Sequence, residues 1–599
     1  MLTKYSVFIP QSGKNNLRER GVFAMKRGVI TVIFVLAVFG FCVSGAMAAN
    51  DPIAFENVKA KNGMVAAANG LASRVGVEIL QKGGNAIDAA VATALALNVV
   101  EPNASGLGGG GFATIRLVDG SVVCWDFREI APLASTKDLF ASEQAQKEKW
   151  SNFGGKAVGV PGSVCGLFTL LNKYGTLSFA EVVAPAIKLA EEGFIVDELL
   201  ASIVADEFEK ISQFNPDGTP YTPDGLPIQA GSTLKNPMLA KAFKLLAEKG
   251  LDVYYNGEIG EAVVAAVVKA GGIMAKEDLP AYKIEQREPV TGTYRGYTVI
   301  APPPASSGGV HVIEILNIME TFPVATWGHN SENFIHALAE TSKMMFADRA
   351  KYMADTAFAK VPLKGLMSKG YAETQAARIG DTAMKTIEPG DPWAFDDIPK
   401  SSHVQAGEHN YHLSTTHFSV MDNKGNVVAW TWTINSFFGS GVFVPEYGFM
   451  LNDEMDDFSP NPASVNAPEP GKRPLSSMTP TLVMDKDGAP YMALGSPGAT
   501  RIILAVSQVI MNAIDFGMSM DEAIEAPRIF NTISGNNAGK LLIEAGVAQS
   551  VLDALTQRGH DVDPRPKGLY FGGAQGIMLK DGEFVGGADS RRNGVAVGF

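Results

Sequence analysis

Cysteine is scarce in this chain of 599 residues, in which only Cys42, Cys124 and Cys165 occur. Three cysteines exclude a scaffold stapled by disulfides. The chain also lacks internal repeats, and its 46% apolar and 19% charged residues exclude a disordered chain and a polytopic membrane protein. The net charge of −13 argues against nucleic acid as a partner, because phosphate binding needs a basic surface.

The first 48 residues have the pattern of a secretory signal peptide. Lys26-Arg27 precede an apolar run over residues 29–43, and Ala46-Met47-Ala48 provides a cleavage site of the small-x-small type. We therefore expect cleavage near Ala48, export to the periplasm or the medium, and no stable membrane anchor. An uncleaved anchor is the alternative, and Met25 is an alternative start.

Removal of residues 1–48 leaves two cysteines, Cys124 and Cys165. In an oxidising compartment they can pair, although isolated cysteines are more often unpaired or buried. The leader carries six basic residues and one acidic residue, so its loss makes the chain still more acidic. An anionic substrate would therefore have to be recognised by individual residues within the binding site rather than by the net charge of the chain.

Three common catalytic motifs are missing: G-x-S-x-G, H-E-x-x-H and the Walker A sequence. Residues 106–111 fit G-x-G-x-x-G, but a dinucleotide site needs a strand before the glycines and a helix after them, and here that order is reversed. Residues 385–414 are polar and irregular and read as a linker. Their histidines, His403, His409 and His412, match no standard metal-ligand spacing.

Helical patterns cover residues 64–98, 179–192 and 333–353. Within the first, Asn85 can cap a helix, with Asp88 as its capping-box partner. A strand is expected over residues 112–117, directly after the glycine run.

Two alternating strands, Thr415–Met421 and Asn426–Ile434, flank a turn that ends in Gly425. The turn fits a three-residue hairpin loop with this glycine in the left-handed bulge position. In that register Thr415 lies opposite Thr433, and Asn435 points to the same face as Thr433. A slip of one residue would destroy this cluster.

A second hairpin, with strands Thr481–Met484 and Tyr491–Leu494, leads into Gly495-Ser496-Pro497-Gly498-Ala499 and a helix over residues 500–512. A glycine-rich turn at a helix N-terminus offers unpaired backbone N–H groups and the positive end of a dipole. The turn is a natural oxyanion hole, although an ordinary strand-to-helix turn would look the same.

The ordered set of motifs resembles the γ-glutamyltranspeptidases, which belong to the N-terminal nucleophile hydrolase superfamily, and it covers most of the chain after the leader. The matching segments are Gly83–Asp88, Leu107–Phe112, Asp126–Glu129, Pro302–Gly309, Asp348-Arg349, Thr415–His417, Thr431–Asn435, Asn452–Phe458, Lys472–Met478 and Gly495–Gly498. The resemblance implies an α/β (α+β) fold of four αββα layers, with two stacked central sheets flanked by helices.

The resemblance also implies that the precursor cleaves itself between Ser414 and Thr415. A large chain, residues 49–414, and a small catalytic chain, residues 415–599, would then remain together as a heterodimer. A threonine hydroxyl needs a base, and cleavage frees an α-amine whose ordinary pKa is about 7.7–8.0. That amine can take the hydroxyl proton, with Thr433 orienting the nucleophile, so cleavage would create the catalyst.

The remaining site residues follow from the resemblance. The α-carboxylate of a γ-glutamyl group would meet Arg128, Ser476 and Ser477, and its α-ammonium would meet Asn435, Glu454 and Asp457. The N–H groups of Gly498 and Ala499 would hold the oxyanion. The implied reaction passes the γ-glutamyl group of glutathione or a similar donor through a Thr415 ester to water or to an amino acid or peptide acceptor. No metal or organic cofactor is expected.

Two departures from the family pattern bear on this expectation. Ala499 stands where many relatives have glycine, and a positive φ there would cost about 1 kcal/mol. Only 18 residues separate Asp457 from Ser476, which predicts an open cleft without the lid of some relatives and favours hydrolysis or larger donors. The alternatives are a cephalosporin or glutaryl acylase, a poly-γ-glutamate hydrolase of the same fold, and a non-catalytic exported binding protein.

Overall fold

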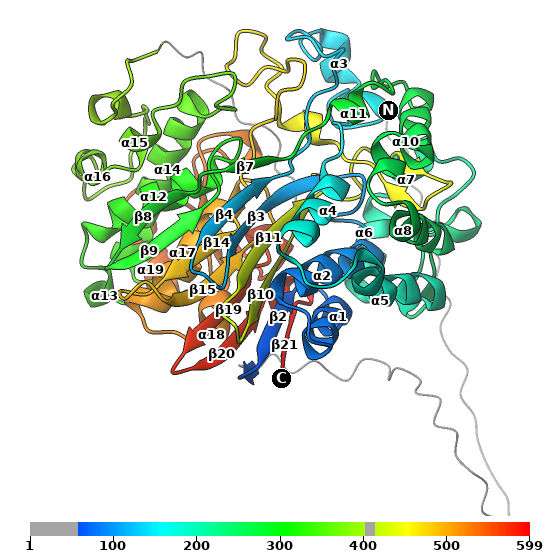
Figure 1. The fold of residues 1–599 in the computed structure, drawn as a ribbon. Coiled ribbons are helices and arrows are strands. Elements are labelled where there is room, and N and C mark those ends of the chain that lie inside the picture. The colour runs from blue at the N-terminus through cyan, green and yellow to red at the C-terminus, as the bar shows by residue number, and fades with distance from the viewer. Residues whose placement is uncertain (1–57, 402–413) are drawn as a thin grey trace, which may run out of the picture. The chain divides into compact units, whose positions relative to one another are not determined.

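The computed structural model describes residues 58–401 and 414–599. They form two seven-stranded antiparallel sheets that pack against each other, with helices on both outer faces (Figure 1). This αββα arrangement confirms the predicted four-layer fold. The sequence predictions that lie outside the described residues are the leader, residues 1–48, and His403, His409 and His412.

The first sheet carries the oxyanion turn predicted from the sequence at one of its strand ends. In spatial order its strands are β1 (Val58–Ala60), β20 (Glu583–Ala588), β19 (Gln575–Lys580), β15 (Pro490–Gly495), β14 (Thr481–Met484), β9 (Tyr297–Ala301) and β8 (Val290–Tyr294). The predicted hairpin of β14 and β15 is therefore confirmed, and it lies in the middle of the sheet.

The second sheet carries the predicted nucleophile. In spatial order its strands are β21 (Val595–Gly598), β2 (Gly63–Ala67), β10 (Thr416–Asp422), β11 (Val427–Thr433), β3 (Gly110–Arg116), β4 (Val122–Asp126) and β7 (Glu285–Arg287). The hairpin of β10 and β11 closes at Gly425, whose φ of +94° confirms the predicted left-handed bulge position.

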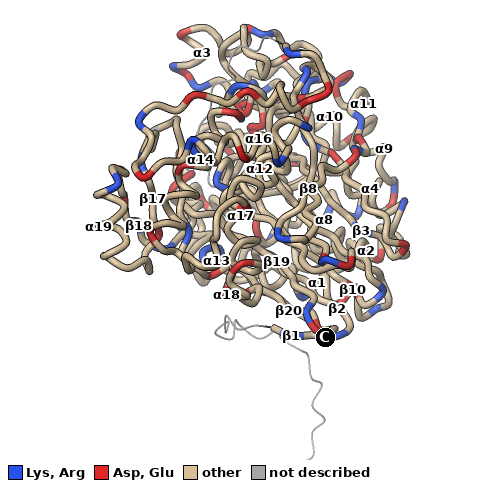
Figure 2. The backbone as a smooth tube through the Cα atoms, turned by 90° about the vertical axis from the view of Figure 1, so that its left-hand side faces the viewer, with Lys and Arg blue, Asp and Glu red and all other residues tan. Residues whose placement is uncertain are grey.

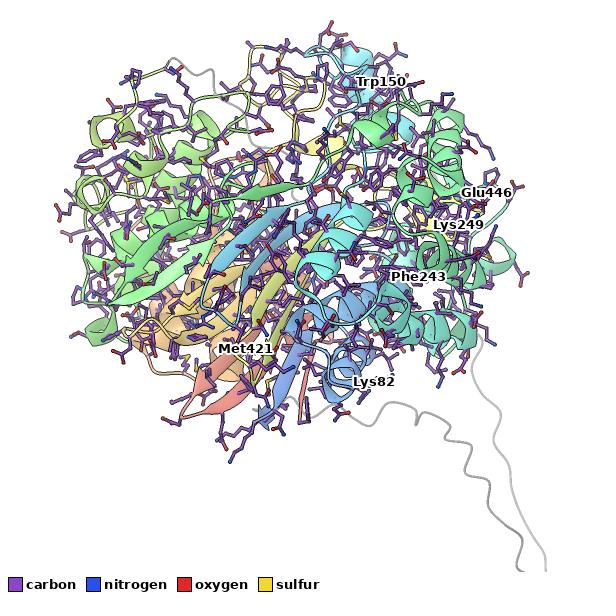
Figure 3. All side chains as sticks on the ribbon, in the orientation of Figure 1. Lys82, Trp150, Phe243, Lys249, Met421 and Glu446 are labelled. Carbon is purple, nitrogen blue, oxygen red and sulfur yellow. The ribbon has the colours of Figure 1, made fainter. Side chains whose placement is uncertain are left out.

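Alanine and methionine side chains, with a few larger ones such as Leu482 and Ile577, fill the space between the two sheets. Met64, Ala66, Met421 and Ala429 of the second sheet meet residues such as Ala493 of the first. Met421 lies inside the fold in Figure 3, whereas exposed lysines point outward at its periphery. Because side chains alternate along a strand, the neighbours of these residues point to the helical layers instead.

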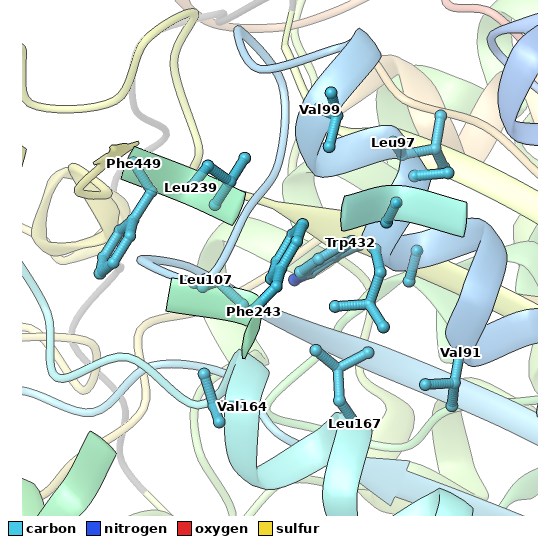
Figure 4. Packing of buried hydrophobic residues seen from close by; sticks show 14 of the residues in the cluster. Val91, Leu97, Val99, Leu107, Val164, Leu167, Leu239, Phe243, Trp432 and Phe449 are labelled. Carbon is cyan, nitrogen blue, oxygen red and sulfur yellow. The ribbon is translucent and has the colours of Figure 1, made fainter. Parts of the chain in front are cut away.

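Large aromatic side chains pack the second sheet against its helices. Trp430 and Trp432 of β11 are fully buried there. Trp432 lies close to Phe243 and Leu167, which come from two different helices (Figure 4). Its indole N–H donates to Oγ of Ser163 at 2.5 Å, so the polar atom of this buried ring is satisfied.

Each helical layer has its own hydrophobic core. The helices that contribute to the core beside the second sheet are α1 (Gly70–Gln81), α2 (Ala86–Val100), α4 (Ser163–Tyr174), α5 (Phe179–Glu192), α6 (Glu198–Asp206), α7 (Phe208–Phe214), α8 (Pro237–Lys249), α9 (Asp252–Tyr255), α10 (Glu258–Lys269) and α11 (Asp278–Ala281). Those beside the first sheet are α12 (Gly308–Glu320), α13 (Val324–Trp327), α14 (Glu332–Tyr352), α15 (Leu363–Leu366), α16 (Lys369–Ala376), α17 (Arg501–Asp515), α18 (Met520–Glu525) and α19 (Gln549–Gln557).

The predicted helix over residues 64–98 is partly wrong. Residues 63–67 form strand β2, and two separate helices follow. A short apolar run does not distinguish a buried strand from a buried helix, which explains the error. The capping box of Asn85 and Asp88 is confirmed at the start of α2, and every residue of that helix is buried.

Within the described residues Cys124 and Cys165 are unpaired, the first buried and the second half-buried. Of the two alternatives that the sequence left open, the structure therefore has free thiols. Basic and acidic residues are interspersed along the chain in Figure 2. No helix among the described residues is long and apolar enough to span a membrane.

Asp88 is more than a helix cap, which generates a stability prediction. Its buried carboxylate accepts bonds from the N–H of Asn85, from the N–H and hydroxyl of Thr176, and from the N–H of Leu177. Asp88→Ala leaves these donors buried and unpaired, so the free energy of unfolding should fall by about 3 kcal/mol. Denaturant titration of the purified protein measures this loss.

Glu181 provides the matched control, because it is the capping-box acid of α5 and is exposed. Glu181→Ala should lower the denaturation midpoint far less than Asp88→Ala. Equal midpoints for the two variants would contradict the assignment of Asp88 as a buried tie between α2 and the segment before α5.

Candidate active site

The predicted nucleophile lies at the start of the central hairpin of the second sheet. β10 and β11 pair in the predicted register, with Thr416 opposite Trp432. The hydroxyl oxygens of Thr415 and Thr433 consequently lie 2.9 Å apart. The N–H of Asn435 donates to Oγ1 of Thr433 at 2.8 Å, which fixes that hydroxyl in place. The structure thus places Thr433 where it can orient the Thr415 hydroxyl.

The backbone at Thr415 is strained. Its φ is +80°, a left-handed value that a β-branched residue rarely adopts and that costs about 1–3 kcal/mol. The surroundings hold this conformation, since Nη1 of Arg592 donates to the Thr415 carbonyl oxygen at 2.9 Å and Oγ of Ser414 donates to the Asn103 carbonyl at 3.3 Å. The torsion includes the Ser414 carbonyl carbon, so breaking the Ser414–Thr415 bond would remove the strain.

The turn between β15 and α17 presents the predicted oxyanion donors. Gly498 has a φ of +123° and Ala499 a φ of +52°, so the condition for strain at Ala499 is met. Among the described residues neither backbone N–H donates a hydrogen bond. Ala499 lines the same pocket as Thr415. Neither N–H group is therefore committed within the described residues, although Gly498, unlike Ala499, is not among the residues that line the pocket.

Arg128 is the electrostatic centre of the pocket and is buried. Its Nη1 donates to Glu454, its Nη2 donates to Oδ2 of Asp457 at 2.5 Å, and its Nε donates to the Pro474 carbonyl at 2.7 Å. A guanidinium has five N–H donors, so two remain for a substrate carboxylate. Three of the predicted substrate-binding residues are thus brought together, and the two acids hold the arginine in position.

Glu129 adds a third carboxyl group beside this arginine. It is fully buried, and neither of its carboxyl oxygens has a hydrogen-bond partner among the described residues. Burial and the neighbouring Glu454 raise the pKa of Glu129 well above its ordinary value. Burial also raises the pKa of Glu454, which Arg128 opposes. One arginine cannot neutralise Glu129, Glu454 and the half-buried Asp457 together, so the raised pKa favours the protonated form of Glu129, while Glu454 contacts Arg128.

The two predicted serines line the same pocket as Arg128. Ser476 accepts a bond from the N–H of Met478 at 3.1 Å through its hydroxyl. Ser477 accepts a bond at 3.2 Å from Nη2 of Arg349, whose Nε donates to Oγ of Ser307 at 2.9 Å. Because the Ser477 hydroxyl accepts a bond from the guanidinium, its own proton is free to point to another acceptor. Ser477 lines the pocket, so that acceptor can be a ligand.

Asn435 is the last predicted ligand. Its φ is +72°, and its Nδ2 donates to the Asp453 carbonyl at 3.0 Å, so its amide oxygen remains as an acceptor. It lines the pocket with the other predicted side chains. The lining residues are Arg128, Arg349, Thr415, Thr433, Asn435, Glu454, Asp457, Asn466, Leu475, Ser476, Ser477, Met478, Ala499, Thr500 and Ile502.

Four charged residues near the site were not predicted as site residues from the sequence: Arg349, Glu129, Glu101 and Arg592. The first two lie within motifs that carry the family resemblance, so a signal existed. Glu101 follows α2, and Arg592 precedes β21, and only the strand order of the second sheet brings Arg592 to the nucleophile.

One group of described side chains has the composition of a metal site, remote from Thr415 in the chain. Nδ1 of His336 lies 2.8 Å from Nε2 of His560, with Glu340 beside them. However, the ammonium of Lys343 already lies 2.7 Å from Oε1 of Glu340. A second cation there would be repelled, so these residues do not favour a metal.

Comparison with known proteins gives consistent matches over almost the whole chain. The family model for Gamma-glutamyltranspeptidase matches residues 72–599. A glutathione hydrolase proenzyme of Bacillus subtilis (strain 168) is 40% identical over 581 residues, covering 95% of this chain and 97% of the relative. An Acylase ACY 1 proenzyme of Pseudomonas sp. (strain SE83) is 39% identical, covering 89% of this chain and 93% of the relative.

Solved structures show the same fold. The crystal structure of cephalosporin acylase from Bacillus halodurans superposes with a TM-score of 0.81 at 30% identity, covering 93% of this chain and 99% of that one. Similarity of this extent, together with the family model, settles the assignment. The chain belongs to the γ-glutamyltranspeptidase family, whose members are enzymes of the N-terminal nucleophile hydrolase type.

Proposed function

We propose that this protein is a self-processing γ-glutamyltransferase and glutathione hydrolase. The observation that carries the proposal is a single pocket that holds the Thr415–Thr433 hydroxyl pair and Arg128 with its two carboxylates. A reactive hydroxyl and a binding site for a free amino-acid head group fit the γ-glutamyl end of a peptide.

Maturation is the first step. Oγ1 of Thr415 attacks the carbonyl carbon of Ser414, the C–N bond breaks, and the proton passes to the nitrogen. Water then hydrolyses the ester, which leaves a carboxylate on Ser414 and a free amine on Thr415. The strained φ of Thr415 supports this step, because cleavage relieves it. The products are residues 49–414 and 415–599, after export has removed the leader.

The catalytic cycle uses the freed amine as a base. The amine takes the proton of Oγ1 of Thr415, directly or through water, while Thr433 holds the oxygen in place. The oxygen attacks the γ-amide carbonyl, and the N–H groups of Gly498 and Ala499 stabilise the oxyanion. The amine product leaves with a proton, and water or an amino acid or peptide acceptor then resolves the ester.

The head group of the donor is recognised by charge. Its α-carboxylate meets the two remaining N–H donors of Arg128 and the hydroxyls of Ser476 and Ser477. Its α-ammonium meets Glu454 and Asp457, with the amide oxygen of Asn435 as a neutral acceptor. A glutaryl amide has the carboxylate but lacks the ammonium. The acidic acceptors therefore favour γ-glutamyl donors over the substrates of an acylase.

Thr415→Ala tests the proposed nucleophile. This variant should remain a single chain on a denaturing gel and show no turnover of a γ-glutamyl anilide, whereas the wild type gives two chains and turnover. Ser414→Ala is the control, because the Ser414 hydroxyl donates to the Asn103 carbonyl and has no other hydrogen bond to the described part of the chain, so it should not be needed for cleavage. An intact, inactive wild-type chain would overturn the proposal in favour of a binding protein.

Asp457→Asn tests the head-group assignment. The change removes one negative charge from the ammonium site, so kcat/KM for a γ-glutamyl anilide should fall at least about 10-fold. Turnover of a glutaryl anilide should fall less, because it loses only the hold of Asp457 on Arg128 and has no ammonium contact to lose. Arg128→Lys should impair both substrates, because both carry the carboxylate. A wild type that prefers the glutaryl anilide would favour the acylase alternative.

A further inference from the structure

Arg592 contacts the nucleophilic residue from the side away from the substrate pocket. Its Nη1 donates to the Thr415 carbonyl oxygen at 2.9 Å, and the side chain is 3% exposed. The residue precedes β21, which pairs with β2, and β2 pairs in turn with β10. A segment near residue 592 is thereby held against the start of β10.

A second pocket lies on this side of Thr415, and its polar groups are incompletely paired. Glu101 and Arg592 line it. Three atoms there are buried without hydrogen-bond partners among the described residues: Oε2 of Glu101, and Nε and Nη2 of Arg592. Burial raises the pKa of Glu101 to about 7 and lowers the pKa of Arg592 to about 10. The guanidinium is therefore still charged at neutral pH.

Chain geometry brings this charge close to the catalytic base. The nitrogen and carbonyl oxygen of one residue are at most about 3.6 Å apart, so Nη1 of Arg592 lies within about 6.5 Å of the Thr415 nitrogen. Once that nitrogen is an α-amine, a fixed positive charge at this range disfavours its ammonium form. A neutral amine is the form that can accept the hydroxyl proton.

The other charged groups around Thr415 have contacts of their own, although not all of these contacts neutralise the charge. Asp589, beside Arg592, is paired with Arg528 and Arg591. Arg501 stacks over Tyr570 at 4.0 Å on the oxyanion side.

On the substrate side, Arg128 is paired with Glu454 and Asp457, and Arg349 is held by two serine hydroxyls. Behind Thr415, the charged residues that line the second pocket are Arg592, Glu101 and Asp197, and none of the three has an ion pair among the described residues. Asp197 accepts bonds from the N–H of Leu200 and from Nδ2 of Asn593 instead.

We propose that Arg592 acts as a positioning residue for the base: it holds the Thr415 carbonyl and keeps the freed α-amine neutral at physiological pH, while Glu101 opposes it. The inference rests on the proposed function, since it requires the amine that cleavage frees. Activity then rises with pH as the amine loses its proton, and the charge of Arg592 sets where that rise occurs.

The test is the pH profile of kcat/KM for a γ-glutamyl anilide, whose acid limb reports the base of the free enzyme. Arg592→Met should move the acid limb upward by about 1 pH unit or more, because the ammonium form is no longer disfavoured. Arg592→Lys, which keeps the charge, should leave the limb near its wild-type position. Glu101→Gln should move it downward by a smaller amount, because Glu101 is only partly ionised there.

Arg565→Met controls for a general change of charge, because Arg565 is exposed and pairs with Asp563; its profile should match the wild type. Acid limbs of Arg592→Met and Glu101→Gln that stay at the wild-type pH, or shift in the same direction, would overturn the inference. If Arg592→Met does not mature, the direction of the Glu101→Gln shift decides. A wild-type chain that neither cleaves nor turns over substrate would instead overturn the proposed function itself.

Discussion

The contact between the hydroxyls of Thr415 and Thr433 depends on one constraint, the register of the hairpin formed by β10 and β11. Side chains alternate along a strand, so a shift of one residue would send Thr433 to the opposite face. The left-handed turn at Gly425 fixes the register at one end, and buried tryptophans on β11 fix it along its length. The packing of both sheets and their helical layers therefore determines where the hydroxyl oxygens of Thr415 and Thr433 lie.

Burial of charge is the second theme of the site. The buried Arg128 is shared by the buried Glu454 and the half-buried Asp457, and burial raises the pKa of Glu129 beside them. Such an arrangement is costly to build unless a ligand or a fixed partner completes it. A zwitterionic head group offers one charge of each sign, which matches a site in which both signs are already present. Arg128 can thus bind the carboxylate of a head group although the whole chain has a negative net charge.

The parts of the fold that were predicted from the sequence are local in the chain. The hairpin register, the capping box of Asn85 and the turn before α17 each depend on a few neighbouring residues whose backbone preferences are strong. Strand β2 was mistaken for helix because its run of apolar residues has no distinguishing period. Arg592 could not be found, because its approach to Thr415 depends on which strands are neighbours in the second sheet. Predictions for residues 1–48 and for the chain termini created by cleavage remain predictions.

The left-handed φ of Thr415 has a consequence for the direction of maturation. An enzyme that transfers acyl groups to amines can in principle rejoin its own two ends, because the Thr415 amine is itself an acceptor. Rejoining would have to restore a conformation that a β-branched residue resists, at about 1–3 kcal/mol. This alone lowers the equilibrium fraction of rejoined chain by roughly five- to 150-fold. In the proposed maturation, the strained backbone of the precursor would thus bias the equilibrium toward the two separate chains.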